Sequence, residues 1–436
     1  SAVLYADDME QFLCKTNADL TADEIHQIID KVRLVGAESE FSTLHMVYGW
    51  MVDGVQFTPQ NGRTRMIPLI DFEHPESNIF RAVNQFAVEY TNNGLKETRR
   101  PDILLFVNGM PLCIIELKNP ADANATIYDA WEQITIRYTR DIPKLMKYCF
   151  LSVLSDGANT KMGSIFKPYK FYYSWNKAND QDKVSNGISS LLTMIEGAFA
   201  KDRVLKVLRD FIFYPDDSKK DEAIVCRYPQ FFAAQKMLDS VKAHMRPEGD
   251  GKGGTYFGAT GCGKTYTMLF LSRLISLRDN DAFRNPTIVI LEDREDLDTQ
   301  TSELFVTAKK YLHAVDVRSI ESRSDMEQTL RDKPSGGVYI TTIQKFCEST
   351  GLLSDRSNII CISDEAHRTQ TGIGAKLKKT DKGVYTTYGF AKYLRDSFPN
   401  ATYCGFTGTP IDETIAVFGQ VVDSYTMKES SDDGIT

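Results

Sequence analysis

The sequence lacks the features that mark membrane, secreted and zinc-binding proteins. None of its apolar runs approaches the ~18 residues that a membrane-spanning helix needs, and no signal peptide opens the chain. Its eight cysteines are scattered, with neither a C-x-x-C pair nor a nearby histidine cluster, which argues against disulfide frameworks and zinc sites. We therefore expect reduced thiols, a cytoplasmic location and no membrane partner.

A net positive charge is also missing. The chain has 51 Lys and Arg against 59 Asp and Glu, which gives a formal net charge of −8. Because the whole molecule repels a polyanion, any DNA-binding role depends on local basic patches. Two segments are candidates, although each could equally be an ordinary solvated face: Arg137, Arg140, Lys144 and Lys147 in the first, and Lys376, Lys378, Lys379 and Lys382 in the second.

The chain shows no internal repeat or low-complexity tract, and its 436 residues exceed one typical hydrophobic core. A helical pattern over about residues 188–213 gives way to a polar, turn-forming stretch over residues 214–222. This predicts one domain over residues 1–214 and a second over residues 223–436.

The clearest motif is the octet from Gly258 to Thr265, which satisfies the pattern G-x-x-x-x-G-K-[ST]. In such a loop backbone N–H groups wrap nucleotide phosphates, the lysine reaches the outer phosphates and the hydroxyl ligates Mg²⁺. A strand candidate precedes the octet and a helical pattern follows it. We predict ATP and Mg²⁺ as cofactors, held by Gly258, Thr260, Gly261, Gly263, Lys264 and Thr265.

A second motif is Asp364-Glu365-Ala366-His367, which follows an apolar run over residues 359–362. Such a run is typical of a buried parallel strand, whose carboxyl end would present both acidic residues. Asp364 would hold Mg²⁺, and Glu365 would orient and deprotonate the attacking water. A surface acidic turn is the alternative interpretation.

Three more apolar runs, over residues 287–291, 338–344 and 401–406, predict further strands. The last of them leads into Thr407-Gly408-Thr409. With the acidic motif, the set resembles the first RecA-like lobe of superfamily 2 helicases and translocases, where this turn couples the nucleotide site to nucleic acid. It is most similar to the restriction (motor) subunit of type I restriction-modification enzymes, and the resemblance places His367, Thr407 and Thr409 at the nucleotide site.

Upstream, Arg227-Tyr228-Pro229-Gln230 resembles the adenine-recognition motif of the same family. An aromatic ring can stack on the base, and an amide can read its edge. The resemblance therefore assigns Tyr228 and Gln230 to adenine binding. A solvated helix residue is the alternative for Gln230.

The amino-terminal region carries a predicted β-hairpin around Asn108-Gly109, which is flanked by two apolar runs typical of β-strands. Two loop lengths are possible. A two-residue loop would pair Val107 with Met110, and a three-residue loop that ends at Met110 would pair Val107 with Pro111.

The loop length decides whether the hairpin forms a catalytic site. The shorter loop sets Asp102 across from Ile115, and the longer loop sets it across from Glu116. Because strand side chains alternate, only the second register puts Asp102, Glu116 and Lys118 on one face, and we predict that register. Asp102 and Glu116 would then share Mg²⁺, with Lys118 steadying the charge that develops on a phosphodiester. A solvated hairpin edge is the alternative.

This arrangement resembles the PD-(D/E)xK nuclease fold, specifically the nuclease domain of the same type I restriction subunits. Members of that family carry a Gln and a Tyr four residues apart on the next helix, which gives Gln133 a catalytic role. Here Tyr138 stands five residues after Gln133, about 140° away on an α-helix unless the helix is locally distorted. The role of Tyr138 is left open. Glu38 and Glu40 are further candidate metal or scaffold carboxylates, or part of an exposed helix face.

The prediction for the whole chain is an α/β protein: a PD-(D/E)xK nuclease-like domain followed by a RecA-like P-loop ATPase lobe with a parallel sheet. The resemblance implies a type I site-specific deoxyribonuclease subunit that translocates double-stranded DNA, cleaves it with Mg²⁺, and works with methyltransferase and specificity subunits. The alternatives are another nuclease-helicase, of type III restriction or repair, and a non-cutting, ATP-switched DNA-binding module.

The expected motor is incomplete. After Thr409 few residues remain, whereas a second RecA-like lobe needs on the order of 150. That lobe would supply an arginine worth ~10³–10⁵ in rate. We therefore expect the second lobe to be absent and the chain alone to bind ATP weakly, hydrolyse it slowly and not translocate.

Overall fold

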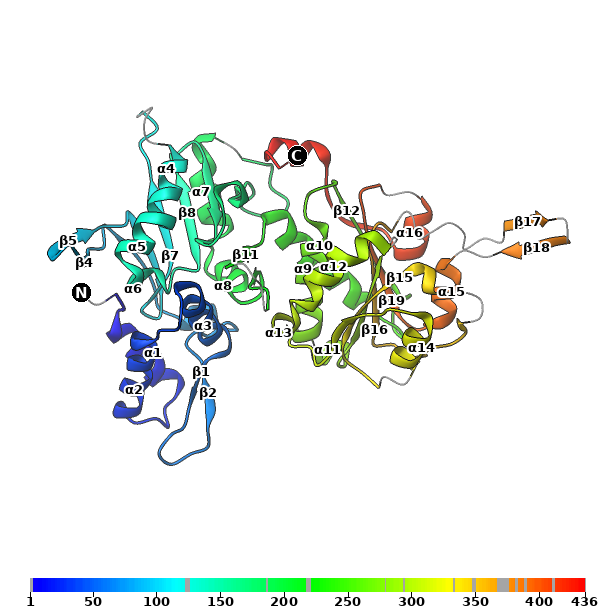
Figure 1. Cartoon of the computed structure of the whole chain (residues 1–436), viewed down its shortest axis with the longest axis horizontal. Helices are drawn as coiled ribbons and strands as arrows, with labels where there is room; N and C mark the ends of the chain where they lie inside the picture. Colours follow the sequence, from blue (N-terminus) through cyan, green and yellow to red (C-terminus); the bar gives the residue numbers. More distant parts are fainter. Residues whose placement is uncertain are drawn as a thin grey trace. The chain divides into compact units, whose positions relative to one another are not determined.

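A computed structural model describes residues 3–121, 126–185, 187–216, 221–278, 280–292, 295–331, 334–346, 350–366, 376–380, 383–387, 390–409 and 412–435. The chain forms two compact units, one comprising Ser1–Tyr214 with Lys219–Tyr228 and the other Pro215–Ser218 with Pro229–Thr436 (Figure 1). Within the described residues, no helix combines the length and apolarity needed to cross a membrane.

The first unit is built on a five-stranded mixed sheet with the order β3-β6-β7-β8-β9. Only β7 and β8 run parallel, and the other neighbours are antiparallel. Every residue of β8 is buried, and so are the first seven residues of β7, which makes these strands the centre of the core. The strands are β3 (Phe80–Asn84), β6 (Ile103–Val107), β7 (Met110–Leu117), β8 (Leu151–Ser155) and β9 (Thr160–Gly163).

Helices precede, connect and follow these strands. Three come before the sheet: α1 (Ala6–Thr16), α2 (Ala22–Leu34) and α3 (Glu40–Asp53). The crossover from β7 to β8 contains α4 (Ile127–Glu132), η2 (Gln133–Tyr138), α5 (Thr139–Asp141) and α6 (Pro143–Met146). After β9 come α7 (Ser190–Gly197) and α8 (Lys201–Asp210), with short helical turns η1 (Pro75–Ser77), η3 (Tyr169–Phe171) and η4 (Gly187–Ser189) elsewhere.

Three small antiparallel ribbons complete the first unit. They are β1 (Val55–Phe57) with β2 (Arg65–Ile67), β4 (Val88–Asn92) with β5 (Leu95–Arg99), and β10 (Ile212–Phe213) with β11 (Ile224–Val225).

The hairpin between β6 and β7 has a two-residue loop, so the predicted three-residue loop is wrong. Asn108 and Gly109 both lie in the left-handed region, with φ of 47° and 81°, and Val107 pairs with Met110. A Cβ on Gly109 would lie 2.1 Å from the carbonyl oxygen of Tyr5, so only glycine fits there. Positive φ at both central residues is the geometry that two-residue hairpin loops prefer.

A bulge in β7 nevertheless gives the predicted alignment of the acidic residues. Phe106 pairs with Pro111, but the next residue back, Leu105, pairs with Cys113. This shift of one residue makes Ile103 pair with Ile115, so the ladder sets Asp102 across from Glu116. Bulges are frequent next to active sites, where they re-aim side chains.

The crossover after β7 contains a π-helical turn. Its first helix, α4, begins at a capping box in which the Asp129 carboxylate accepts the backbone N–H of Thr126 at 2.6 Å. From Gln133 to Tyr138 the helix is a π-helix, in which backbone hydrogen bonds span five residues instead of four. Each turn is wider than in an α-helix, so residues five apart lie near the same face, and Gln133 and Tyr138 come into contact.

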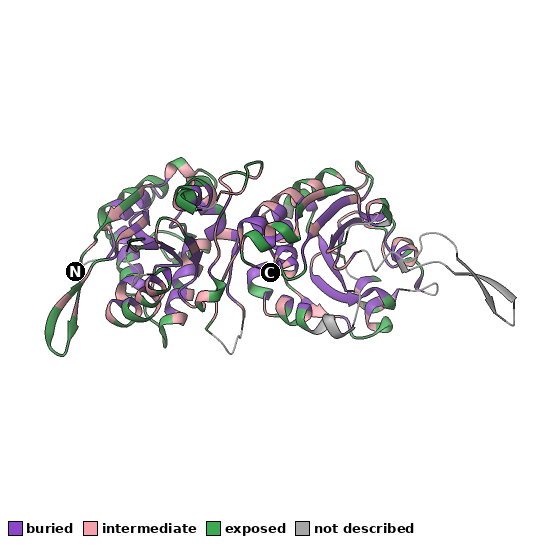
Figure 2. Ribbon diagram, turned by 90° about the horizontal axis from the view of Figure 1, so that it is seen from above, coloured by how far each residue is buried: buried purple, intermediate pink, exposed green. Residues whose placement is uncertain are grey.

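The second unit is built on a seven-stranded sheet in which all neighbours are parallel, with the order β14-β15-β13-β16-β19-β12-β20. All residues of its central strands β13, β15, β16 and β19 are buried, and strands drawn in purple make up the middle of this unit in Figure 2. Helices cover both faces (Figure 1), as an all-parallel sheet requires. The strands are β12 (Lys252–Gly258), β13 (Thr287–Glu292), β14 (Val317–Ser319), β15 (Val338–Thr342), β16 (Ile359–Ser363), β19 (Thr402–Thr407) and β20 (Val421–Tyr425).

The connections of this unit are mostly helical. They are α9 (Tyr228–Ala243), α10 (Lys264–Arg273), the π-helix η5 (Leu274–Arg278), α11 (Asn280–Phe283), α12 (Glu295–Val306), α13 (Lys309–Leu312), α14 (Arg323–Arg331), η6 (Ile343–Lys345), α15 (Phe390–Ser397), α16 (Asp412–Phe418) and α17 (Met427–Asp432). A ribbon of β17 (Lys376–Thr380) and β18 (Gly383–Thr387) lies between β16 and α15 in the chain. The predicted α/β class and parallel sheet are confirmed.

Strand order explains where the second site forms. β16, β19 and β12 are neighbours, and each ends in one of the predicted motifs. Because parallel strands share the edge at which they end, the acidic motif, the Thr-Gly-Thr turn and the phosphate loop meet there. Ligands of open parallel sheets bind at this edge.

Candidate active sites

The octet from Gly258 to Thr265 forms the loop between β12 and α10. Gly261 and Gly263 lie in the left-handed region, with φ of 82° and 85°, which favours glycine. A Cβ on Gly263 would also lie 2.6 Å from the Nε2 of Gln230. Helix α10 starts directly after Gly263, so its first backbone N–H groups lack helical acceptors and can bind phosphate.

Lys264 is held over this loop. Its side chain is largely buried, and its Nζ donates to the carbonyl oxygen of Gly258 at 3.3 Å. The same Nζ lies 3.4 Å from the Oε1 of Glu365. Phosphate oxygens would compete with these two acceptors for the ammonium group, so the motif lysine and the motif glutamate meet where a triphosphate would lie.

Asp364 and Glu365 directly follow β16. Burial raises the pKa of Asp364 to about 6, although the backbone N–H of Glu365 donates to its Oδ1 at 2.9 Å. A divalent cation would favour the ionised form, so this buried carboxyl fits a Mg²⁺ ligand. Glu365 has a φ of 44°, which is uncommon for a residue other than glycine and recurs at functional sites.

The turn after β19 lies against the phosphate loop. The backbone N–H of Thr409 donates to the Oγ1 of Thr407 at 3.1 Å, which closes the turn. A Cβ on Gly408 would lie 3.5 Å from the Oγ1 of Thr260 and 3.9 Å from the Nζ of Lys264. The structure therefore brings the Thr-Gly-Thr turn to the predicted nucleotide site. His367 lies outside the described residues.

The two predicted adenine-binding residues differ in their surroundings. Gln230 is 4% exposed on α9, and its Nε2 donates to the carbonyl oxygen of Gly263 at 3.1 Å. The ring of Tyr228 is buried in the first unit, with its centroid 6.4 Å from that of Trp175. The structure thus brings Gln230 to the phosphate loop, and the adenine role of both residues stays a prediction.

In the first unit, Glu116 is the centre of a hydrogen-bonded cluster. It is 3% exposed near the end of β7. Its carboxylate accepts hydrogen bonds from the Nε2 of Gln133 and, at 3.3 Å, from the Oη of Tyr138. The Nζ of Lys118 lies 3.5 Å from its Oε1. The structure therefore brings the predicted glutamate, lysine and glutamine together.

Tyr138 belongs to this cluster in spite of its unusual spacing. Gln133 donates from its Nε2 to the Oη of Tyr138 at 2.7 Å, and its Oε1 accepts from the Nζ of Lys118 at 2.7 Å. The π-helical turn η2 makes this possible, because it returns Tyr138 to the face that carries Gln133. The structure thus shows a local distortion of the helix, a possibility that the sequence left open.

Asp102 is oriented from two sides. Its Oδ2 accepts the backbone N–H of Leu117 at 2.8 Å, and its Oδ1 accepts from the Nε2 of Gln85 at 2.9 Å. Gln85 has a φ of 52°. No role was predicted for this residue, which directly follows β3, the strand that pairs with β6 next to Asp102.

The electrostatics of the cluster favour a cation between the two carboxylates. Burial raises the pKa of Glu116 to about 7, and the negative charge of Asp102 adds to the rise, while Lys118 and the hydrogen bond from Tyr138 oppose it. The described residues contain no group of three or more His, Cys, Asp and Glu side chains that could hold a metal. Two carboxylates suffice for Mg²⁺, which usually keeps several of its waters. The donor set therefore fits the predicted ion.

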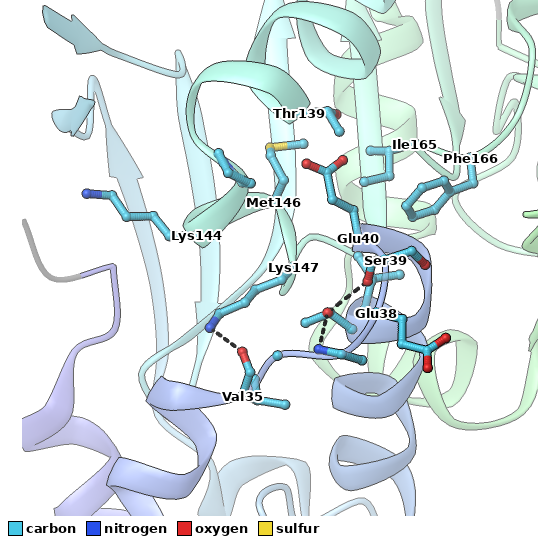
Figure 3. Close-up of a pocket in the computed structure, with 15 residues that line it drawn as sticks. Val35, Glu38, Ser39, Glu40, Thr139, Lys144, Met146, Lys147, Ile165 and Phe166 are labelled. Carbon is cyan, nitrogen blue, oxygen red and sulfur yellow. Dashed lines mark hydrogen bonds between the residues drawn. The ribbon is translucent and has the colours of Figure 1, made fainter. Parts of the chain in front are cut away.

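Glu38 and Glu40 line a separate cavity of about 420 Å³ beside α3 and α6 (Figure 3). Lys144 and Lys147 line it as well, and the Nζ of Lys147 donates to the carbonyl oxygen of Val35 at 2.9 Å. Burial raises the pKa of Glu40. Among the described residues neither glutamate contacts Asp102 or Glu116, so the contacts give no support for either as a metal ligand there.

Fold and sites together define a nuclease-like unit joined to a P-loop ATPase with a parallel sheet. Residues 2–171 match the family described as type I restriction enzyme R protein N terminus, and residues 229–436 match the SWI2/SNF2 ATPase family. The chain belongs to the family of type I restriction enzyme endonuclease subunits, as its motifs predicted.

Two curated relatives carry this result. The type I restriction enzyme HindI endonuclease subunit of Haemophilus influenzae is 32% identical over 451 residues, which cover 100% of this chain and 42% of the relative. The putative type I restriction enzyme MjaIXP endonuclease subunit of Methanocaldococcus jannaschii is 33% identical over 421 residues, which cover 89% of this chain and 37% of the relative. The chain thus spans less than half the length of these relatives.

Proposed function

We propose that this chain cuts double-stranded DNA with a Mg²⁺-dependent centre in its first unit and moves along DNA with an ATP-driven motor to which its second unit belongs. One observation carries the nuclease proposal. A buried glutamate faces an aspartate, a lysine, a glutamine and a tyrosine, and burial and the aspartate together raise its pKa to about 7. Such clusters are typical of catalytic centres.

Each side chain of the first centre has a distinct task. Mg²⁺ held by Asp102 and Glu116 would polarise the phosphodiester and supply hydroxide. Lys118, held by Gln133, places positive charge where negative charge develops on the phosphate. Gln133 and Tyr138 fix the orientation of the Glu116 carboxylate through their hydrogen bonds.

The second centre divides its tasks similarly. The loop from Gly258 to Thr265 would bind the phosphates, with Lys264 on the outer ones. Asp364 and the hydroxyl of Thr265 would hold Mg²⁺, and Glu365 would orient the attacking water. The Thr407-Gly408-Thr409 turn lies against the loop, so it can transmit the state of the nucleotide.

The proposed partners follow from the family. They are double-stranded DNA and the methyltransferase and specificity subunits of a restriction complex, in the cytoplasm. The net charge of −8 means that DNA must meet local basic surfaces of the chain.

The test compares single substitutions in the complex assembled with these subunits. Asp102→Ala, Glu116→Ala and Lys118→Ala should each remove DNA cleavage and leave ATP hydrolysis largely intact. Lys264→Ala should remove ATP hydrolysis and cleavage far from the recognition site. Lys206→Ala, an exposed lysine on α8, is the matched control. Near-normal cutting by Glu116→Ala would refute the nuclease centre, and translocation by Lys264→Ala would refute the motor.

A further inference from the structure

A two-stranded ribbon lies in the connection between β3 and β6 of the first unit, beside the proposed nuclease centre. Strands β3 and β6 are antiparallel neighbours whose ladder ends at the pair Asn84 and Ile103. The chain between them does not turn directly. It runs out as β4 and back as β5, which pair only with each other. The ribbon is thus an addition to the sheet at its active edge.

Both ends of the ribbon are fixed at a proposed metal ligand. The backbone N–H of Gln85, just before β4, donates to the carbonyl oxygen of Asp102 at 3.0 Å. The Gln85 side chain donates to the Asp102 carboxylate at 2.9 Å. Any molecule that contacts the ribbon near its base is therefore close to the nuclease centre.

A second anchor ties the ribbon to the helix of Tyr138. Arg99 of β5 lies 2.6 Å from the Oδ2 of Asp141 on α5, and its guanidinium lies 4.9 Å from the ring centre of Tyr90 on β4. The Asp141 side chain is 6% exposed. Isolated two-stranded hairpins are marginally stable in water, and these contacts hold this one against the body of the unit.

The ribbon carries exposed side chains that do not pack against the rest of the unit. Leu95, next to the turn, is 70% exposed. Lys96 and Arg100 are exposed, and neither forms an ion pair or side-chain hydrogen bond with the described residues. The same holds for Arg137 on η2, close to the nuclease cluster. In a chain with a net charge of −8, cations without partners around one carboxylate centre favour a polyanionic ligand.

We propose that the ribbon of β4 and β5 docks in a groove of duplex DNA beside the phosphodiester to be cut. This inference rests on the proposed nuclease function. The major groove, ~12 Å wide, admits a two-stranded ribbon, and five-residue strands extend about 17 Å. Lys96 and Arg100 contact phosphates, and Leu95 contacts the floor of the groove, where apolar side chains can meet the methyl group of thymine.

Charge reversal with a matched control tests the proposal. Lys96→Glu with Arg100→Glu is compared with Lys15→Glu and Lys206→Glu, exposed lysines of α1 and α8 that lack ion pairs among the described residues. The chain is titrated against a fluorescent 30-base-pair duplex in Ca²⁺, and the anisotropy gives the affinity at several salt concentrations. The ribbon variant should bind at least about tenfold more weakly, with a salt slope lower by about 2. The control should change less than half as much.

The outcomes separate this inference from the nuclease proposal. Equal losses in the two double variants would overturn the docking surface, whatever Glu116→Ala does to cleavage. Unchanged duplex affinity with lost capture of the methyltransferase and specificity subunits would make the ribbon a protein-binding surface instead. Cleavage by Glu116→Ala would overturn the nuclease centre without changing the measured affinities. Equal thermal unfolding of both double variants shows that folding is not the cause.

Discussion

The two proposed centres combine similar side chains on different backbone designs. Each places a buried carboxyl with a raised pKa near a lysine: Glu116 lies near Lys118, and Asp364 lies within the electrostatic influence of Lys264, whose Nζ is 3.4 Å from the neighbouring Glu365. The nucleotide site forms from contiguous motifs at the ends of neighbouring parallel strands. The proposed nuclease centre depends on two irregularities, a β-bulge and a π-helical turn.

This difference shows why one site is easier to read from sequence than the other. The residues of the phosphate loop are contiguous, so the spacing of the motif is enough to predict which of them bind phosphate. The nuclease residues are spread from Asp102 to Tyr138, and one inserted residue in the strand and one in the helix bring them into line. The comparison predicts that the two centres function independently and tolerate different changes.

The largest expected effects come from removing one carboxylate charge in each centre. Asp364→Asn should lower ATP hydrolysis by roughly 10²–10³-fold, as the loss of one strong electrostatic group does elsewhere, and leave metal binding at Glu116 unchanged. Glu116→Gln should remove that metal binding and leave nucleotide affinity unchanged. A phosphate-release assay on the assembled complex measures ATP hydrolysis, and calorimetric titrations with Mn²⁺ and with a non-hydrolysable ATP analogue measure the metal and nucleotide affinities. Coupled losses would contradict the independence of the two centres.

Deleting one residue tests the π-helical turn. Ile136 is 54% exposed within η2, and its deletion should restore a regular helix that still directs Gln133 and Tyr138 to one face. We expect a change in unfolding free energy below about 1 kcal/mol. Deletion of Lys206 from the regular helix α8 should cost more than about 4 kcal/mol, because it rotates buried residues into solvent. If the two deletions lower the unfolding free energy equally, η2 does not contain one residue more than a regular helix needs.

Metal binding at the nuclease centre should depend on pH. With a pKa of about 7, Glu116 is protonated below neutrality, and a cation must displace that proton. Apparent Mn²⁺ affinity should fall by about tenfold per pH unit below pH 7 and level off above it. Affinity that stays constant between pH 5.5 and 8 would contradict the burial of this carboxyl.

Folding stability should follow the same carboxyl with a defined sign. Its pKa is raised from an ordinary 4.5, so the unfolded chain loses the proton first and the metal-free fold loses stability as pH rises from 4.5 to 7. Glu116→Gln removes this pH-dependent loss of folding stability, which is worth up to roughly 3 kcal/mol. Relative to the parent chain, the variant should therefore be more stable at pH 8 than at pH 4 in denaturant unfolding without metal.

The smallest effect concerns the start of the crossover. Thr126→Ala removes the side-chain acceptor of the capping box of α4 and should cost about 1 kcal/mol. Thr91→Ala, at an exposed position of β4, is the control. Because α4 leads into η2, the cap variant should also weaken Mn²⁺ binding slightly, whereas nucleotide affinity should not change. If the two variants unfold identically, the capping box of α4 does not stabilise the fold.

The sequence predicted the parallel sheet, the phosphate loop, the acidic motif and the alignment of Asp102 with Glu116. The predicted loop length was wrong. A two-residue loop followed by a bulge sets Asp102 across from Glu116, just as a three-residue loop would. Pro111 was the available signal, since proline inside a paired strand marks an edge, a start or a bulge. The spacing of Gln133 and Tyr138 likewise indicated an inserted residue. The role of Gln85 was not predicted, because it depends on the pairing of β3 with β6.

The most direct test of the account is the position of a metal ion in the first unit. A crystal grown with Mn²⁺ and no nucleotide should show an anomalous peak within about 2.0–2.6 Å of an oxygen of Asp102 and an oxygen of Glu116. A peak at neither carboxylate, or the two carboxylates more than about 8 Å apart with Mn²⁺ bound elsewhere in the first unit, would contradict the shared metal on which the proposed nuclease centre depends.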